Sequence, residues 1–398
     1  MKSPLKIILA VLFISLLLTA MIAIALYVPN SLHTNSDFLA MYDADLRLLQ
    51  GFGPYGYQSQ IQWMAQQTNT SVENIYVPQF PYPPWIPLST VYLGLMPIQS
   101  AAMLWFEINL VMLFLTVWFL GADWNPRLRL YSLLAPFLFI PVIGTLGVGQ
   151  YGFPVLLGSA ISMHAIRHKR LALTALGTAL LTYKPHIGLP VVLVLMVYFL
   201  LRRDAFGRRA LAWMLGGLAL LCIVSMIAGP LWFIDYPRSF LTYQTGTDIA
   251  SCAACDSIPA WLANHFIPNP TLPQMTAIGA ILLILFLLLF GTVGARLLKS
   301  ADYLINASLL IVLLVIPHLY NYDFILLITP FALLAEKAHS RAERILLIVL
   351  YLLPLAAIAN LDRTSGDPSL LLVTLALTLL VFIHAHELPQ LDVSPRAA

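Results

Sequence analysis

The sequence NSDFLAMYDADLRLLQGFGPYGY (residues 35–57) follows the first hydrophobic run of the chain, and a polar segment separates it from QFPYPPW (residues 79–85). From Asp37 to Gln50, apolar side chains recur at helical spacing, which predicts a short helix that rests on a membrane surface. The apolar stripe comprises Leu39, Tyr42, Leu46 and Leu49. The glycines and proline of the following turn, Gly51–Tyr55, end this helix.

The composition places the chain in a membrane. Of its 398 residues, 60% are hydrophobic and 10% are charged, whereas soluble proteins carry about a quarter charged residues. The net charge of +3 is spread over short clusters, which indicates membrane topology and no nucleic-acid partner. Three cysteines are too few for a disulfide scaffold or a zinc ribbon. We therefore expect an all-α polytopic membrane protein whose residues 1–398 form a single integral membrane domain.

The hydrophobic runs predict about twelve membrane-spanning helices, several of them short enough to be tilted or broken. They lie at Ile7–Val28, Met103–Leu120, Tyr131–Val148, Phe153–Ile166, Leu171–Tyr183, Leu189–Leu201, Ala210–Ala228, Met275–Leu297, Leu304–Pro317, Phe324–Leu334, Ile345–Ile358 and Leu370–His384.

The short apolar piece Ile86–Met96, which prolines bracket, decides the topology. If it lies at the interface without crossing, nearly all Lys and Arg residues fall on the side of the N-terminus, as the positive-inside rule requires. The exceptions are Arg47, Lys184, Arg238 and Arg363. Both termini are then cytoplasmic, and the loops 29–102 and 229–274 lie on the extracytoplasmic face of the inner cell membrane.

Asp37 is the carboxylate at the start of the first outer loop. In its Asn-Ser-Asp setting it could cap the following helix. A carboxylate just above the hydrocarbon, in a partly desolvated pocket, also suits a general base. Asp43 and Asp45 follow within two helical turns and are expected to be solvated or paired with Arg47.

Lys184 stands at the outer end of a span, where the positive-inside rule disfavours it, and such a residue is by default a functional candidate. Together with Pro185 and His186 it begins a helix, and a lysine beside free backbone N–H groups can hold a phosphate. Snorkelling to the lipid headgroups is the structural alternative. Glu107 lies inside a span and needs a partner, for which Lys184 or a polar cavity is expected.

Two further outer connections carry polar side chains. Gln150, in the glycine-rich turn GVGQYG (residues 147–152), is a neutral hydrogen-bonding group that suits hydroxyls or phosphate. Pro317 ends a span, and the residues after it bring four polar groups together, which predicts a site lining. These groups are His318, Tyr320, Asn321 and Asp323. The imidazole is a second candidate for acid–base work or for a hydrogen bond to phosphate.

The second outer loop carries a C-x-x-C pair, Cys252 and Cys255, which we expect to be a structural disulfide because no metal-binding set completes it. Arg238 in the same loop could face a substrate or the headgroups. Tyr55 and Tyr82 belong to an aromatic belt typical of membrane interfaces, although aromatic faces also bind sugars and lipid chains.

In their order, these motifs resemble the GT-C superfamily of membrane glycosyltransferases, and most closely glycosyltransferase family 87. Members of that family are similar to polyprenyl-phosphate-mannose-dependent α-mannosyltransferases. The matching positions are Asp37-Phe38, Tyr42, Leu48 and the Gly51…Pro54-Tyr55 turn, then Tyr82-Pro83-Pro84, Gly149-Gln150, Lys184-Pro185 and Pro317-His318…Tyr320.

The resemblance implies a GT-C fold with juxtamembrane helices in the first outer loop, and a hexosyl- or pentosyltransferase. Asp37 or His318 would be the base. The donor would be a polyprenyl-phosphate sugar, expected to be mannose, and the acceptor a glycan or glycolipid. Donor phosphate binding is expected of Lys184, Gln150, His186 and Arg238. The substrate pocket is expected to include Tyr42, Tyr55, Tyr82, Glu107, Tyr320, Asn321 and Asp323. One displacement would invert configuration at the anomeric carbon.

No cofactor is expected, and no metal either, because Asp43 and Asp45 diverge if they lie on a helix. The alternative function is transport of a polyprenyl-linked sugar, which needs a similar lipid-phosphate pocket. Transporters often show inverted repeats and half-helices at the bilayer midplane. The sequence shows no such repeat and gathers its ionisable residues at one face, which favours a transferase.

Overall fold

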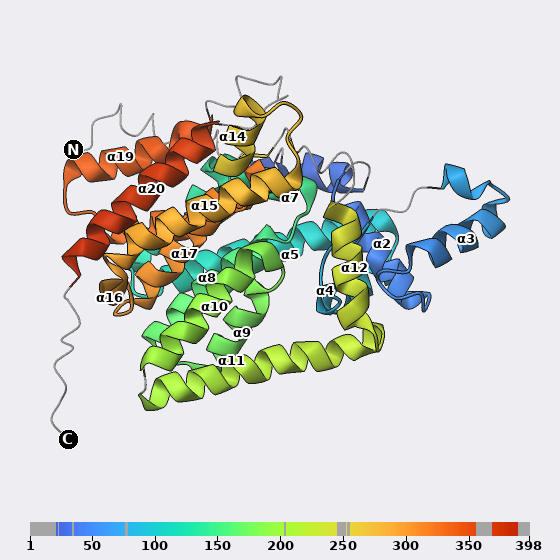
Figure 1. Cartoon of the computed structure of the whole chain (residues 1–398), viewed down its shortest axis with the longest axis horizontal. Coiled ribbons are helices and arrows are strands. Elements are labelled where there is room, and N and C mark those ends of the chain that lie inside the picture. Colours follow the sequence, from blue (N-terminus) through green and yellow to red (C-terminus); the bar gives the residue numbers. More distant parts are fainter. Residues whose placement is uncertain are drawn as a thin grey trace.

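The computed structural model describes residues 21–22, 24–33, 36–75, 79–202, 204–244, 252, 255–355 and 368–388. Within these ranges all regular elements are helices (Figure 1), as the composition predicts. Most of the expected first span, Ile7–Val28, and part of the one at Ile345–Ile358 lie outside the described residues.

A group of short helices precedes the bundle and gathers, with α12, at the right of Figure 1. These helices are α2 (Phe38–Leu49), α3 (Tyr57–Thr68), η1 (Val72–Asn74), α4 (Trp85–Thr90) and η2 (Val91–Leu95). We call this end of the molecule the loop end. The expected interfacial piece at Ile86–Met96 is thus a short α-helix continued by a 3₁₀ helix, which together are too short to be a candidate span.

The bundle and α12 comprise the remaining helices. They are α5 (Ile98–Leu120), α6 (Pro126–Ser132), η3 (Ala135–Leu138), α7 (Ile140–Val148), α8 (Gly152–Arg167), α9 (Leu171–Leu181), α10 (Pro185–Arg202), α11 (Ala205–Val224), η4 (Ser225–Ala228), α12 (Trp232–Gln244), α14 (Ile258–Phe266), α15 (Leu272–Gly291), α16 (Gly294–Leu297), α17 (Ala301–Val315), η5 (Asn321–Leu327), α18 (Ile328–Lys337), α19 (Arg341–Leu352) and α20 (Pro368–Glu387).

Among the described residues, 5 helices are long and apolar enough to cross a membrane: α5, α10, α11 with η4, α15 and α20. The expected number of about twelve is therefore not confirmed, because helices such as α9, with 11 residues, fall short of the roughly 20 that a full crossing needs. The expected span at Tyr131–Val148 is wrong as a single helix. It is divided into α6, η3 and α7, since Pro136 and Pro141 lack the backbone N–H that a continuous helix requires.

Helices α8 and α17 form the centre of the bundle, where almost all of their side chains are buried. By contrast, α11 and α15 keep long apolar faces exposed, including Ile223 and Leu288. Exposing aliphatic faces of this extent to water is energetically unfavourable, so they identify the surface that lipid covers. The sequence and the fold together establish an all-α membrane protein.

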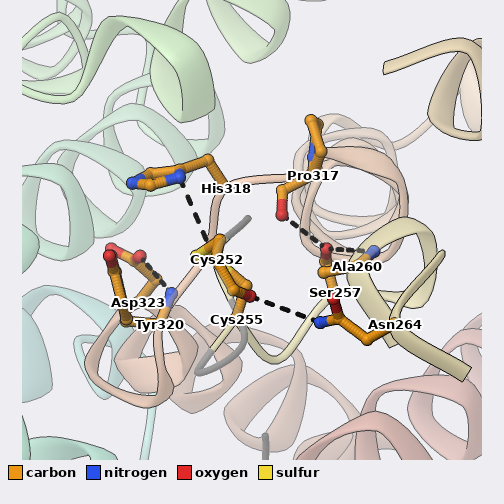
Figure 2. The surroundings of a disulfide bond; sticks show 9 residues. All are labelled: Cys252, Cys255, Ser257, Ala260, Asn264, Pro317, His318, Tyr320 and Asp323. Atoms are coloured by element: carbon orange, nitrogen blue, oxygen red, sulfur yellow. Dashed lines mark hydrogen bonds between the residues drawn. A yellow bond between two sulfur atoms is a disulfide. The ribbon is translucent and has the colours of Figure 1, made fainter. Parts of the chain in front are cut away.

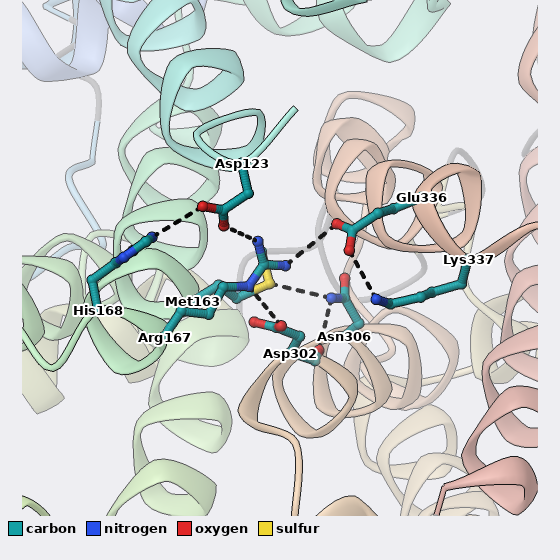
Figure 3. Close-up of polar contacts among 8 residues, drawn as sticks. All are labelled: Asp123, Met163, Arg167, His168, Asp302, Asn306, Glu336 and Lys337. Carbon is teal, nitrogen blue, oxygen red and sulfur yellow. Dashed lines mark hydrogen bonds and ion pairs between the residues drawn. The ribbon is translucent and has the colours of Figure 1, made fainter. Parts of the chain in front are cut away.

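The bundle end opposite the loop end is held by one guanidinium group (Figure 3). Arg167 of α8 lies 2.7 Å from Asp302 of α17, 3.6 Å from Asp123 after α5 and 3.8 Å from Glu336 of α18. These contacts join segments that are far apart in the sequence. Because Arg167 is followed by further Lys and Arg residues, we call this end the basic end.

At the loop end, α2 packs between α4, η2 and α5, and its buried face differs from the predicted stripe. Phe38, Met41 and Ala44 are buried, whereas Leu49 is 44% exposed. The neighbouring helices cover the face that carries Phe38, Met41 and Ala44. The apolar stripe that was predicted to rest on the membrane is only half-buried.

The charged residues of α2 form a buried network. Arg47 donates to Asp43 Oδ2 at 2.8 Å, as expected, and to Gln60 of α3 at 2.9 Å. The sequence had suggested that Asp45 is solvated or paired with Arg47. Instead it is fully buried and accepts a hydrogen bond from Thr90 of α4 at 3.0 Å. Burial raises the pKa of Asp45 to about 8, and the Thr90 hydrogen bond and the nearby guanidinium only partly oppose this rise.

The raised pKa of Asp45 predicts a pH-dependent stability. Between its ordinary pKa of 3.8 and about 8, the carboxyl is protonated in the folded protein and ionised in the unfolded chain, so the free energy of unfolding falls as pH rises. Asp45→Asn keeps the oxygen that accepts from Thr90 and removes the ionisation. We expect it to raise the melting temperature, measured in detergent, more at pH 8 than at pH 5. An equal change at both pH values would contradict this account.

Candidate functional site at the loop end

A cavity of about 320 Å³ opens at the loop end. One wall is polar and gathers most of the residues that the sequence had nominated: Tyr82, Gln150, Lys184, His186, His318, Tyr320 and Asp323. The rest of the lining is largely apolar and comes from α12, the start of α15 and the end of α17. It includes Phe240, Leu241, Leu272, Thr276 and Ile316.

Lys184 forms a buried ion pair with Asp323, with both side chains at most 3% exposed. The sequence had offered Glu107 as a partner and snorkelling as an alternative, and both are wrong. Glu107 is exposed on α5. The pairing follows from the energetics of burial, because an ammonium group removed from water needs a counter-charge close by. Lys184 Nζ also lies 4.7 Å from the ring centroid of Tyr322.

Asp323 is in turn fixed by its own element. Its second carboxylate oxygen accepts a hydrogen bond from the backbone N–H of Tyr320 at 3.0 Å, at the start of η5. The carboxylate therefore links the first turn of η5 to the residue that precedes α10. Two helix starts are joined at the floor of the cavity.

Asp37 is linked to residues of the cavity lining by a chain of side-chain hydrogen bonds. Gln150 Nε2 donates to Asp37 Oδ2 at 2.5 Å, and Tyr82 OH donates to Gln150 Oε1 at 2.9 Å. The capping alternative is wrong for this side chain: Asp37 makes no cap hydrogen bond, and the N–H of Phe38 is bonded to Ser36 Oγ at 3.2 Å. The carboxylate is thus free of a capping role and bonded to Gln150.

Gly149 explains how Gln150 reaches Asp37. Its φ of 71° is in the left-handed region, and an added Cβ would lie 2.9 Å from both Leu32 Cδ2 and Phe38 Cβ. Only glycine permits this turn to pack directly against the start of α2. Trp105 Nε1 donates to the Gly149 carbonyl at 2.8 Å and fixes the turn from the side of α5.

His318 lies between the cavity and a disulfide (Figure 2). Cys252 and Cys255 are joined as expected, and Cys255 Sγ lies 3.9 Å from His318 Nδ1. The imidazole Nε2, which is buried, has no hydrogen-bond partner among the described residues. Burial lowers the pKa of His318, an effect that Lys184 increases and Asp323 opposes, so the imidazole is neutral at neutral pH.

The segment around the disulfide also fixes the turn that carries His318. Ser257 Oγ donates to the Pro317 carbonyl at 2.9 Å, and the N–H of Asp256 donates to the Leu319 carbonyl at 2.8 Å. The loop that contains the C-x-x-C pair therefore supports the part of the cavity lining that includes His318.

The structure places other nominated residues outside this cavity. Tyr42 donates to the Met96 carbonyl at 2.8 Å and joins α2 to the end of η2. Asn321 lies against Gly144 of α7. Tyr55 and Arg238 line a different cavity, of about 500 Å³.

Several residues of the cavity were missed from the sequence. Tyr322 stands within the polar run after Pro317, and its contact with Lys184 could have been sought there. Phe240, Leu241 and Leu272 carry no local signal, because an apolar residue beside a membrane reads as an ordinary lipid contact. Only the fold, which brings α12 and the start of α15 to the same cavity, places them beside the polar residues.

Polar side chains gathered at one end of an apolar helical bundle define a membrane-embedded enzyme or transporter. Comparison with protein families decides between these classes. The family model of glycosyltransferase family 87 matches residues 80–317, which is more than half of the chain, and the chain therefore belongs to this family. The match includes Tyr82, Gln150 and Lys184, whereas Asp37 precedes it and His318 directly follows it. No curated protein and no solved structure matches the chain.

The Lys184–Asp323 pair yields a stability prediction. Asp323→Asn keeps an acceptor for the Tyr320 N–H but leaves the buried ammonium unpaired, and we expect a loss of about 3–5 kcal/mol in the free energy of unfolding. Adding Lys184→Met removes the unpaired charge and should recover most of the melting temperature. A double variant that melts as low as Asp323→Asn would contradict a mainly electrostatic role for this pair.

The disulfide yields a second prediction. Replacing Cys252 and Cys255 together by serine should lower the melting temperature only slightly, because the closed loop is short. Loosening the turn that carries His318 should raise the KM for the sugar donor several-fold. Cys222 is the matched control, since it is free and exposed, and Cys222→Ser should change neither quantity. An unchanged KM in the double-serine variant would show that the disulfide does not shape the cavity.

Proposed function

We propose that this glycosyltransferase moves a sugar, mannose in the first instance, from a polyprenyl-phosphate donor to a hydroxyl of a glycan or glycolipid acceptor. The observation that carries the proposal is the position of Asp37. The Asp37 carboxylate is hydrogen-bonded to Gln150, and Gln150 lines a cavity whose lining also includes a lysine and a set of apolar side chains. This is the arrangement that a lipid-linked sugar phosphate and an attacking hydroxyl require.

In the proposed reaction, the oxygen of the acceptor hydroxyl attacks the anomeric carbon of the donor sugar. Asp37 accepts the proton of that hydroxyl at the same time. The bond from that carbon to the phosphate oxygen breaks, and its electron pair stays on the departing polyprenyl phosphate. One displacement of this kind inverts the configuration and needs no covalent intermediate with the enzyme. Gln150 acts as a positioning residue, because its amide is already engaged by Asp37 and Tyr82.

The polar floor suits the departing phosphate. Lys184 and His186 both line the cavity, and a fixed positive charge aimed at a developing negative charge is an effective form of catalysis. The Asp323 carboxylate balances Lys184 before the donor arrives, so the empty cavity carries no uncompensated charge. The ammonium can then share its hydrogen bonds between this carboxylate and the phosphate.

His318 suits a sugar hydroxyl. A disulfide sulfur has no proton to donate, so any hydrogen bond at Nδ1 is donated by the ring, which leaves Nε2 as an acceptor. His318 lines the cavity, and a neutral imidazole whose Nε2 has no partner among the described residues can orient a hydroxyl of the donor sugar. We assign the role of base to Asp37 and this orienting role to His318.

The apolar wall suits the polyprenyl chain. Leu241 lines the cavity and is also 63% exposed on the outside of α12. Leu272 and Thr276, near the start of α15, also line the cavity. Further along the same helix, most of the leucines are exposed. A lipid chain could leave the cavity sideways between α12 and α15 into the bilayer. The positive-inside rule assigns the basic end to the cytoplasm, so this site faces the extracytoplasmic side.

The central test is Asp37→Asn. Loss of the base should lower kcat by about 10²–10⁴-fold, while the melting temperature and the affinity for the donor stay close to those of the wild type. Glu73→Gln, an exposed carboxylate-to-amide change in η1, is the control and should transfer sugar normally. Full transfer by Asp37→Asn would remove Asp37 from the mechanism.

The donor is tested with the purified protein and a panel of polyprenyl-phosphate sugars that includes mannosyl and arabinosyl forms. We expect turnover, or a rise in melting temperature, with at least one of them, and we expect Lys184→Met to abolish that rise. If none of these donors gives turnover or a shift, the donor class is wrong.

A further inference from the structure

The second cavity, of about 500 Å³, takes no part in the reaction described above. It lies between the Gly51–Tyr57 turn that follows α2 and the junction of η4 with α12. Gly53 permits this close meeting: its φ is 73°, and an added Cβ would lie 3.1 Å from the Ala228 carbonyl oxygen. Two segments far apart in the sequence thus enclose one space.

The walls of this cavity combine aromatic rings with groups that can form hydrogen bonds. The side chains include Tyr55, Tyr57, Trp232, Asp235, Arg238 and Ser239. The tyrosine hydroxyls are already engaged, since Tyr55 donates to the Tyr82 carbonyl at 2.6 Å and Tyr57 to the Phe80 carbonyl at 3.1 Å. These bonds fix the rings, so the two tyrosines offer rigid apolar faces.

Asp235 and Arg238 supply the polar part. They stand three residues apart on α12, which places them on one face of the helix. Neither forms an ion pair within the described part of the chain, so a ligand can engage both the carboxylate and the guanidinium. Fixed aromatic faces with a few convergent polar groups match a sugar, which has apolar ring faces and a rim of hydroxyls.

The distance from Asp37 limits what this cavity can do. Asp37 precedes α2 and Gly51 follows it, and the 12 residues of the helix correspond to about 18 Å. A hydroxyl bound at the Gly51 edge of this cavity is therefore too far from Asp37 to give it a proton. Tyr82 nevertheless joins the two cavities, because its carbonyl accepts from Tyr55 while its hydroxyl donates to Gln150.

We propose that the second cavity binds the non-reacting sugars of an oligosaccharide acceptor, so that the enzyme elongates an existing glycan chain. This inference rests on the proposed transfer at Asp37. Binding energy from sugars remote from the reacting hydroxyl can then orient the acceptor for attack. Arg238, which the sequence had nominated for the donor phosphate, serves the acceptor in this account.

The test compares synthetic α-mannosyl acceptors from one to four sugars long. With the wild type, kcat/KM should rise with acceptor length. Asp235→Asn combined with Arg238→Ala should lower kcat/KM about tenfold for the tetrasaccharide and less than twofold for the monosaccharide. Ile234→Ala, an exposed aliphatic change on α12, is the matched control and should leave the length dependence intact. An equal loss for all lengths would overturn the proposal.

A binding measurement separates this proposal from the reaction itself. Titrating the tetrasaccharide into Asp37→Asn protein should change the tryptophan fluorescence, because Trp232 lines the second cavity, and the Asp235→Asn/Arg238→Ala changes should weaken that binding. If no acceptor is glycosylated but this binding is observed and is weakened, the proposed reaction fails and the sugar site stands. Absence of binding to the Asp37→Asn protein would overturn the sugar site.

Discussion

A buried ammonium group is the constraint on which the loop end of this protein depends. Lys184 stands where a helix begins and water is excluded, and its charge can remain there only because Asp323 faces it from a separate helix start. The pair fixes the relative positions of α10 and η5, and Asp323 also holds the backbone of Tyr320. Removing either charge would leave the other uncompensated, so the geometry of the cavity floor and the stability of the bundle are set by the same contact.

The sequence predicted the membrane class, most of the helices and much of the cavity. Gln150, Lys184 and His318 each follow or precede a break between apolar runs on the same side, and alternating helices bring such breaks together. The pairing of Lys184 with Asp323 could not be predicted, because the two are separated by 139 residues and Glu107 was an equally reasonable partner. The burial of Asp45 was missed because α2 was treated as lying on a surface, whereas α4 and η2 enclose it. Likewise, Arg238 could be placed in the second cavity only once the direction of α12 was known.

Tyr82 unites the parts of the site that the sequence treats separately. It belongs to a proline-rich stretch without regular structure, and such a stretch has no helix to fix its side chains. The surrounding tyrosines supply that order instead, by donating to the carbonyls of Phe80 and Tyr82. Tyr55 and Tyr57, which line the second cavity, hold the backbone of the stretch. The side chain of Tyr82 in turn holds Gln150, which lines the first cavity.

The contacts of Arg167 restrict how the molecule can change shape. One planar guanidinium joins the chain after α5 to α8, α17 and α18, so sliding any of these helices along its axis would separate several charges at once. Shear motion is therefore opposed at the basic end. At the loop end, α12 follows Gly229, whose φ of 152° favours glycine, and we expect a bulky lipid-linked molecule to enter on this side. Substrates could then exchange at the loop end while the contacts of Arg167 keep the basic end in place.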